Sequence, residues 1–431
     1  MALIYHRALG KDISSTGYAV MQKKTIWYCH PTAGSPQEGM SYRPYYLAKY
    51  WQETGHQAYV ISASYHHLLH TPQVQTEDLR YQQIDGVNYI RLKTPHYQNN
   101  GLRRMFSMLT YAFQFRKQQQ KLFEMTGKPD VIIVSSTHPF HYLSLYPIAK
   151  KHQIPLIFEV RDLWPSSLIE LLKLKPWHPL IVILNLIEKH AYQHSRYVVS
   201  LLADAKSYMM SQGLAAHKFV YIPNGTDCSP QTEAEKLPPK LKHTITDLNH
   251  HNRFLIGYAG SLGIPNAMEH FIHAMAILQH TNPHIQALLV GKGHQKEVLM
   301  AYCQTHHINN VHFFDPIPKR QVHHFLKSMD LLYLGWQDIK LYQYGVSPNK
   351  IFDYMLAGRP ILESGGAPSS LVELAGCGSR CLPSAALIAQ HIVEISSFPK
   401  AKLNDLGHKG QTYVHNNHHY LQLAIKYSHL L

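Results

Sequence analysis

Cysteine is scarce in this sequence, whose 431 residues contain Cys29, Cys228, Cys303, Cys377 and Cys381 and no other. An odd and scattered set of this kind predicts reduced thiols and a cytoplasmic protein, and it excludes a disulfide framework. Cys377 and Cys381 stand four residues apart, but two thiols without further partners make a poor metal site. We therefore expect them to be structural.

Long apolar runs are also missing. The best one, Pro179–Ile187, is too short to cross a membrane and is followed by Glu188 and Lys189. The N-terminus has no apolar segment with a small-residue cleavage site, so we expect no signal peptide. Residues 1–20 show no clear pattern, and we expect a disordered extension or an over-long start before a basic flank and strand at Met21.

Acidic residues are few: 27 Asp and Glu stand against 41 Lys and Arg, giving a formal net charge of +14. Such a surplus favours an anionic partner, such as phosphorylated substrates or an anionic membrane surface. Because the charge is dispersed, we do not expect a nucleic-acid partner. The histidine clusters at 66–70 and 415–419 lack carboxylate or thiol partners, so we expect solvated histidines and no metal site.

What the chain does have is short apolar strands alternating with amphipathic segments, twice over. This pattern predicts an α/β protein with two doubly wound domains of mainly parallel strands that face a cleft. We expect a first domain over 21–224, a polar connector over 225–253, a second domain over 254–402 and a helical segment over 403–431. The expected strands lie at 25–30, 58–64, 87–92, 130–136, 155–160, 197–202 and 219–224, then at 254–261, 285–293, 310–316, 330–336 and 359–364.

Ligands bind such sheets beyond the carboxyl ends of the strands. After the first strand, Gly34 and Ser35 allow close backbone approach, and Arg43 can reach into the cleft from the following helix. The alternative is a plain strand-to-helix loop. His138, after the strand at 130–136, can polarise a hydroxyl or accept a proton, or else it is a core or capping histidine.

Charges are concentrated after the strand at 155–160, where Glu159, Arg161 and Asp162 stand next to Trp164. Charged groups are costly to bury without partners, so three of them at this depth favour a site that faces a substrate. The alternative is a structural Arg161–Asp162 ion pair.

The second domain carries a phosphate-type loop with Gly260 and Ser261, a cation at Lys292, and a loop at Pro316 on which a base can rest. Its most informative segment is "YGVSPNKIFDYMLAGRP", from Tyr344 to Pro360. A turn leads there directly into a helix, whose exposed N–H groups and dipole suit a diphosphate. The residues that we expect to act there are Gly345, Val346, Ser347, Asn349, Lys350 and Asp353. The alternative is that Asn349 and Asp353 are ordinary residues of a helix N-terminus.

The segments "FEVRDLWPSSLIEL", "IPNGTD", "YAGSLG" and "SPNKIFDYMLAGRPI" resemble the bacterial family-4 glycosyltransferases, and in particular the L-fucosamine or N-acetyl-amino-sugar transferases of surface polysaccharide pathways. The resemblance covers most of the chain from Met21. It implies the GT-B fold, in which a C-terminal helix crosses back to the first domain. It also implies a UDP-sugar donor, retention of configuration, and neither cofactor nor metal, in keeping with the missing Asp-x-Asp motif.

The resemblance also assigns roles to individual residues. Asp353 matches the second Glu of the family's Glu-x7-Glu motif, which holds the donor ribose, whereas Gly345 replaces the first Glu. Lys292 and Lys350 are candidates to bind the diphosphate in place of a missing Arg/Lys pair. The roles expected for the first domain are catalysis at His138, Arg161 and Asp162, donor contact at Gly34 and Ser35, and acceptor contact at Arg43, Glu159 and Trp164.

The family's usual acceptor is a glycan on polyprenyl diphosphate, as in O-antigen or capsule biosynthesis. Residues 101–123 mix Arg and Lys with Phe, Met, Leu and Tyr, which favours a peripheral helix on an anionic membrane surface, or else a helix packed on the sheet. Two other functions remain open: a UDP-sugar 2-epimerase of the same fold, and a non-catalytic sugar-nucleotide-binding partner. The sequence leaves the oligomeric state open.

Overall fold

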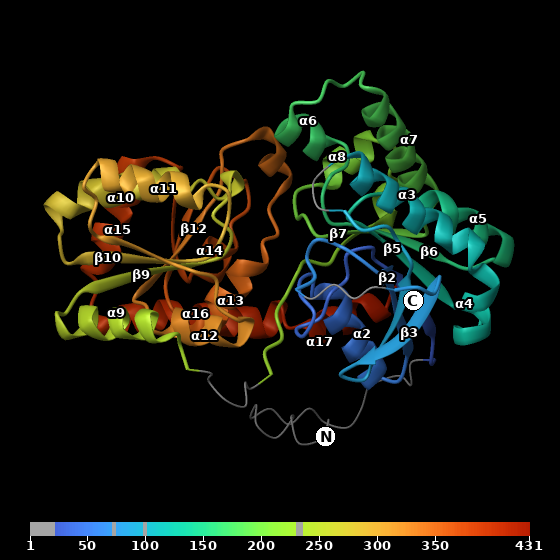
Figure 1. Cartoon of the computed structure of the whole chain (residues 1–431), viewed down its shortest axis with the longest axis horizontal. Coiled ribbons are helices and arrows are strands. Elements are labelled where there is room, and N and C mark those ends of the chain that lie inside the picture. Colours follow the sequence, from blue (N-terminus) through green and yellow to red (C-terminus); the bar gives the residue numbers. More distant parts are fainter. Residues whose placement is uncertain (1–21, 71–74, 98–100, 230–235) are drawn as a thin grey trace.

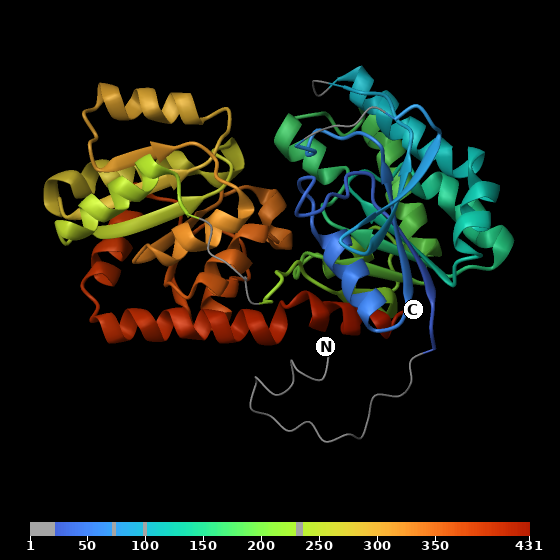
Figure 2. The ribbon, with the colours of Figure 1, turned by 60° about the horizontal axis from the view of Figure 1, so that its bottom comes forward.

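The computed structural model describes residues 22–70, 75–97, 101–229 and 236–431. The expected extension, residues 1–20, lies outside these ranges. Two α/β domains lie side by side, and the last helices of the chain run from the second domain back to the first (Figures 1 and 2). The expected fold class, two doubly wound domains with a C-terminal helix that crosses back, is confirmed.

The N-terminal domain is built on a sheet of eight strands in the order β3-β4-β2-β1-β5-β6-β7-β8. Every pairing in this sheet is parallel except that of β3 with β4. The strands are β1 (Thr25–Cys29), β2 (Gln57–Ala63), β3 (Leu79–Ile84), β4 (Val87–Leu92), β5 (Val131–Ser136), β6 (Leu156–Val160), β7 (Tyr197–Ser200) and β8 (Phe219–Tyr221).

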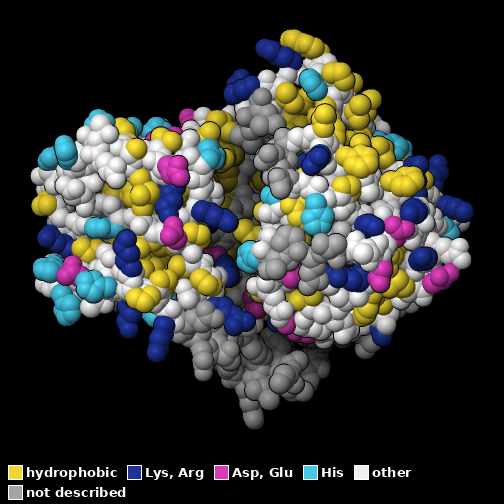
Figure 3. Space-filling model, viewed as in Figure 1, with side chains coloured by type: hydrophobic (Ala, Val, Ile, Leu, Met, Phe, Trp, Pro, Cys, Tyr) yellow, Lys and Arg dark blue, Asp and Glu magenta, His cyan; other side chains and the backbone are white. Residues whose placement is uncertain are grey.

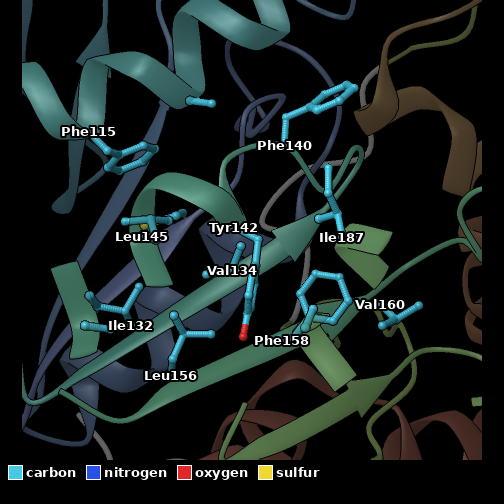
Figure 4. Packing of buried hydrophobic residues seen from close by; sticks show 14 of the residues in the cluster. Phe115, Ile132, Val134, Phe140, Tyr142, Leu145, Leu156, Phe158, Val160 and Ile187 are labelled. Atoms are coloured by element: carbon cyan, nitrogen blue, oxygen red, sulfur yellow. The ribbon is translucent and has the colours of Figure 1, made fainter. Parts of the chain in front are cut away.

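Helices cover both faces of this sheet. Because side chains alternate along a strand, Trp27 and Cys29 pack into the core on one face, while Ile26 and Tyr28 pack into the core on the other. Figure 4 shows part of the first core, where Phe115 of α3 and Leu145 of α5 lie near Ile132 and Val134. The helices are α2 (Arg43–Glu53), α3 (Leu102–Lys117), α4 (Gln119–Thr126), α5 (Tyr142–His152), α6 (Ser166–Leu172), α7 (Pro179–His194), α8 (Lys206–Ser211) and η1 (Ala216–Lys218).

The C-terminal domain has a six-stranded parallel sheet in the order β11-β10-β9-β12-β13-β14. The strands are β9 (Phe254–Ala259), β10 (Ile285–Val290), β11 (Val311–Phe314), β12 (Leu331–Gly335), β13 (Ile361–Ser364) and β14 (Gly378–Cys381). The helices are α9 (Pro239–His250), η2 (Ile264–Asn266), α10 (Met268–Thr281), α11 (Lys296–Thr305), α12 (Lys319–Lys327), η3 (Lys340–Tyr344), α13 (Asn349–Ala357), α14 (Leu371–Ala375) and α15 (Ala385–Ser396).

Part of the expected connector belongs to the second domain. Within residues 225–253 the chain forms α9, which buries Leu241 and Ile245 against the C-terminal sheet. Polar residues at the other positions of this amphipathic helix hid these two contacts from the sequence analysis.

The expected C-terminal helical segment consists of two helices, α16 (Lys400–Asn417) and α17 (Tyr420–Ser428). α16 packs on α13 of the second domain, and α17 packs on α2 of the first. The Trp51 indole donates a hydrogen bond of 3.1 Å to the Ala424 carbonyl, which fixes α17 on the first domain. The chain therefore ties its two domains together at its own C-terminus (Figure 2).

Candidate functional site

The carboxyl ends of the two sheets face each other across a groove, which is visible between the two halves of the molecule (Figure 3). Backbone and side-chain contacts join the two walls at its base. Asn224, just after β8, donates from its side-chain amide to the Ser347 carbonyl at 3.0 Å. The Asp204 N–H, after β7, donates to the Tyr344 carbonyl at 3.2 Å. The segment that the sequence marks as informative thus lies between the domains.

The turn before α13 is shaped by one glycine. Gly345 has a φ of +95°, a region that favours glycine, and an added Cβ would lie 3.2 Å from the Ala203 nitrogen. Pro348 has extended backbone and occupies the N-cap position of α13, which begins at Asn349. No side chain caps this helix end, so its N–H groups can donate hydrogen bonds to an anion.

Asp353, one turn into α13, faces the other domain. Its carboxylate forms an ion pair with Lys319 at the start of α12, and Thr226 of the first domain donates to it at 3.4 Å. The side chain is about one-fifth exposed, so hydroxyl groups of a ligand can reach it. This position agrees with a role in binding a ribose.

Lys350 is enclosed within the same site. Its ammonium donates to the Tyr258 hydroxyl at 2.9 Å and to the Asn266 side chain, and it lies 5.6 Å from the centre of the Trp336 ring. Burial lowers the pKa of Lys350 to about 7. The stem passes so close to Gly260 that a Cβ there would lie 2.9 Å from its Cδ. The glycine of the predicted loop therefore makes room for this lysine.

The remaining predicted residues of the second domain lie near the surface. Lys292 and Pro316 are exposed, and Ser261 is exposed while its carbonyl accepts a 2.5 Å hydrogen bond from the Tyr258 hydroxyl. Val346 and Ser347 are half-buried between the domains. All of them lie at the carboxyl end of their sheet, as the strand pattern predicts.

Gly345 and Val346 also border a cavity of about 540 Å³ on the side of the C-terminal helices. Residues of both domains line it, among them Tyr221 and Ser369, together with Lys426 of α17. This cavity lies at the hinge between the two domains.

On the first domain's wall, Asp162 is open to the groove. Its partial withdrawal from water raises its pKa, although the neighbouring Arg161 has the opposite effect. Arg161 donates to the His30 ring at 2.9 Å, and the described residues contain no Arg161–Asp162 ion pair. Trp164 is half-buried against the N-terminal core. Arg161 and Asp162 thus remain available to a ligand in the groove.

The acceptor role expected for Arg43 and Glu159 is corrected by the structure. Both side chains are buried, and the Arg43 guanidinium binds the Glu159 carboxylate at 2.9 and 3.0 Å. Tyr28 and Ser135 donate to the other carboxylate oxygen at 2.6 and 2.7 Å. These contacts hold the pKa of Glu159 below its ordinary value against the effect of burial. The pair therefore ties α2 to β6 beneath the groove.

Gly34 and Ser35 are also buried. An added Cβ on Gly34 would lie 1.9 Å from the Gly39 carbonyl oxygen, so this glycine serves a tight loop. The Gly34 carbonyl accepts from the Tyr89 hydroxyl at 2.8 Å. Donor contact at Gly34 and Ser35 stays a prediction.

Histidines are more buried than the sequence suggests. His138 is 2 % exposed, and His66 and His418, expected at the surface, are 0 % and 3 % exposed. The His66 ring is bound to the Ala33 carbonyl at 3.2 Å, and His418 to that of Asn224 at 3.0 Å. Among the described residues, no three His, Cys, Asp or Glu side chains are grouped as metal ligands.

Sequence reasoning missed Asn224, Thr226 and Asp204, which contact the second domain, and Lys319, which pairs with Asp353 within that domain. Asn224 and Thr226 follow β8, so the rule that ligands bind beyond the carboxyl ends of strands could have marked them. Lys319 begins a helix with no motif around it, so only the fold brings it to Asp353.

The chain resembles known proteins in two ways. Residues 38–225 match the model of the glycosyl transferase 4-like domain, and residues 253–397 match that of the glycosyl transferases group 1. A search of curated proteins gave no significant match.

Solved structures share the whole fold at low identity. Sucrose-phosphate synthase from Thermosynechococcus elongatus is 14% identical with a TM-score of 0.70, and the match covers 95% of this chain and 98% of that one. HepE from Anabaena, in complex with UDP and glucose, is 12% identical with a TM-score of 0.62, covering 94% and 99%. A UDP-forming α,α-trehalose-phosphate synthase from Burkholderia vietnamiensis is 11% identical with a TM-score of 0.68, covering 95% and 100%.

The first model covers strands β2 to β8 and the second covers strands β9 to β14, and the structural neighbours extend over both domains. The chain is a glycosyltransferase with the GT-B fold, formed by a glycosyl transferase 4-like domain and a glycosyl transferases group 1 domain.

Proposed function

We propose that the chain transfers an amino or deoxy sugar, with retention of configuration and without a metal, from a UDP-sugar to a lipid-linked glycan of the kind used for bacterial surface polysaccharides. The observation that carries the donor part is the α13 segment. There an uncapped helix N-terminus, the half-buried Lys350 and the accessible Asp353 face the same groove. These three features suit a diphosphate followed by a ribose.

In this proposal the chain's own groups stabilise the departing UDP. The α13 N–H groups and Lys350 offset the charge that develops on the diphosphate, which is the task of a metal in other transferases. Asp353 accepts hydrogen bonds from the ribose hydroxyls. Asp162, across the groove, orients the acceptor hydroxyl for attack on the face that UDP leaves.

Two structural neighbours support the choice of nucleotide. One neighbour is in complex with UDP and glucose, and another is described as UDP-forming. These ligands belong to those proteins, and for this chain UDP remains part of the proposal.

The test is to incubate the protein with a panel of UDP-sugars and a bacterial lipid extract and to measure released UDP. Asp353→Asn should raise the donor KM about 10-fold or more, because it weakens a hydrogen bond to a charged group worth about 1.5–3 kcal/mol. Asp247→Asn, on the exposed face of α9, is the matched control. An unchanged donor KM in Asp353→Asn would refute the donor site.

The same incubations, with the UDP-sugars themselves also analysed, separate the other two functions. An epimerised UDP-sugar formed without acceptor would establish the 2-epimerase. Donor binding without any UDP release would favour the non-catalytic partner, which the replacement of the family's first Glu by Gly345 also suggests. NMR of the product's anomeric configuration tests retention.

We further propose that the acceptor is presented by an anionic membrane. Exposed apolar side chains project from neighbouring helices of the first domain, and Figure 3 shows hydrophobic side chains gathered where α3 and α7 lie in Figure 1. The largest are Leu102, Phe106 and Phe113 on α3, Trp177 before α7, and Leu186 on α7. None of the described helices is long and apolar enough to cross a bilayer, so the contact would be peripheral.

Charge around this surface complements an anionic bilayer. Residues 101–128 carry a single acidic side chain, Glu124, among basic ones. The basic residues of this stretch are Arg103, Arg104, Arg116, Lys117, Lys121 and Lys128. A helix with an apolar face and basic flanks is typical of membrane-surface binding.

Flotation with phosphatidylglycerol vesicles tests this part. The double variant Phe106→Glu/Phe113→Glu should stay in the bottom fraction, whereas Val298→Glu, an equally exposed apolar position on the second domain, should float like the parent protein. Equal flotation of all three proteins would refute the membrane surface.

A further inference from the structure

A cavity of about 30 Å³ opens on the first domain's side of the groove, beneath α3. About 10–15 Å³ is enough for one water, so it has room for a small polar group. Loops after β1, β2 and β5 form its floor through Thr32, His66 and Thr137. Among the described residues that line it, none is acidic.

Several polar atoms around this cavity have no hydrogen-bond partner among the described residues. They are both ring nitrogens of His138, Nδ1 of His66 and the Thr137 hydroxyl. Buried polar groups are normally satisfied, and a group of exceptions around one cavity indicates a missing ligand or water. His138 is 2 % exposed and lines the cavity, so this is a built polar pocket.

A positively charged side chain also lines the cavity. Arg104, in the first turn of α3, lines it and lies 5.9 Å from the centre of the Tyr97 ring. The N-terminus of α3 has no side-chain cap and no acidic residue in its first turn, so its dipole adds to this charge. Burial lowers the pKa of His138, whose neutral ring supplies a single N–H donor.

The two faces of α3 thus differ in character. Arg104, Ser107 and Tyr111 point to the cavity, while Phe106 and Phe113 are exposed on the outer side. A molecule with a phosphate head and an apolar tail fits both faces at once.

We propose that this cavity binds a phosphate group of the lipid-linked acceptor, held by Arg104, Thr137 and His138, with the lipid following the outer face of α3. The inference rests on the proposed function, because it names the acceptor group that the first domain recognises. It places the lipid phosphate at the carboxyl ends of β1, β2 and β5, on the first domain's wall of the groove.

The test uses a matched ligand series in detergent: farnesyl diphosphate, farnesyl phosphate and farnesol, with inorganic diphosphate as the soluble arm. Binding is measured by isothermal titration calorimetry on the full chain. Arg104→Gln is compared with Arg103→Gln, its exposed neighbour on the same helix turn. Thr137→Val keeps the shape of the side chain and removes one donor, and thermal melts check that each variant is folded.

We expect farnesyl diphosphate to bind at least 10-fold more tightly than farnesol, and Arg104→Gln and Thr137→Val to reduce that difference while Arg103→Gln retains it. Equal binding of farnesyl diphosphate and farnesol, or equal losses in both arginine variants, would overturn the proposal. Inorganic diphosphate that binds as tightly as the farnesyl ligand would overturn the lipid assignment. This binding test does not depend on UDP release, so its failure can be distinguished from failure of the proposed transferase reaction.

Discussion

Lys350 gives the sharpest test of the donor site, because its charge depends on pH in the physiological range. Burial lowers its pKa to about 7, and a bound diphosphate favours the protonated ammonium. Donor affinity should therefore fall as the pH rises through 7. For a single group with this pKa, the dissociation constant increases about 10-fold between pH 6 and pH 8.

The assay is calorimetric titration with UDP-N-acetylglucosamine, a ligand whose diphosphate does not titrate in this range. Lys350→Met should weaken binding at pH 6 about 10-fold or more, since a hydrogen bond to a charged group is worth about 1.5–3 kcal/mol. It should also abolish the pH slope. Lys292→Met, at an exposed lysine on the next loop, should lower the affinity and keep the slope. A pH slope that persists in Lys350→Met would refute this reasoning.

Three further predictions concern stability in urea melts. Arg43→Met should lower the free energy of unfolding by about 3–5 kcal/mol, because it leaves the Glu159 charge buried and unpaired. If Arg43 instead bound the acceptor, the variant would change the rate of transfer and leave the free energy of unfolding unaltered. Burial raises the pKa of Glu188 to about 8, so stability should fall from about pH 4.5 to 8 by up to ~1.36 kcal/mol per pH unit, and Glu188→Gln should remove this component. Gly345→Ala should cost about 1–3 kcal/mol through backbone strain, whereas Gly263→Ala, with ordinary φ and no contact nearer than 3.4 Å, should be nearly neutral.

Most of the sheet could be predicted because buried parallel strands are continuous apolar runs. The two strands that were missed do not have this pattern. β3 is a polar antiparallel strand at the edge of the N-terminal sheet. β14 has only four residues, Gly378–Cys381, and lies at the edge of the C-terminal sheet. Edge strands need fewer apolar residues, so their pairing is decided by the neighbouring strand and not by their own sequence.

The candidate site was predictable in its position but less so in its contacts. The rule on the carboxyl ends of parallel strands located Asp162 at the groove, and the helix N-terminus after the turn at Tyr344 located Lys350 and Asp353. The same rule also selected Glu159, which is the last residue but one of β6 and points below the groove to Arg43. A shift of a few residues along a strand changes a ligand contact into a buried ion pair, and sequence spacing does not resolve that difference.

The contacts between the domains explain why donor binding and domain arrangement should depend on each other. Ser347 and Asp353 belong to the segment that would hold the nucleotide, and both also contact the first domain, at Asn224 and Thr226. A ligand that draws Asp353 toward its ribose competes with the Thr226 hydroxyl for the same carboxylate. The hinge cavity beside Gly345 would change its volume with any such movement, since residues of both domains line it. The segment at the start of α13 is therefore both the proposed donor site and one of the places where the two domains contact each other.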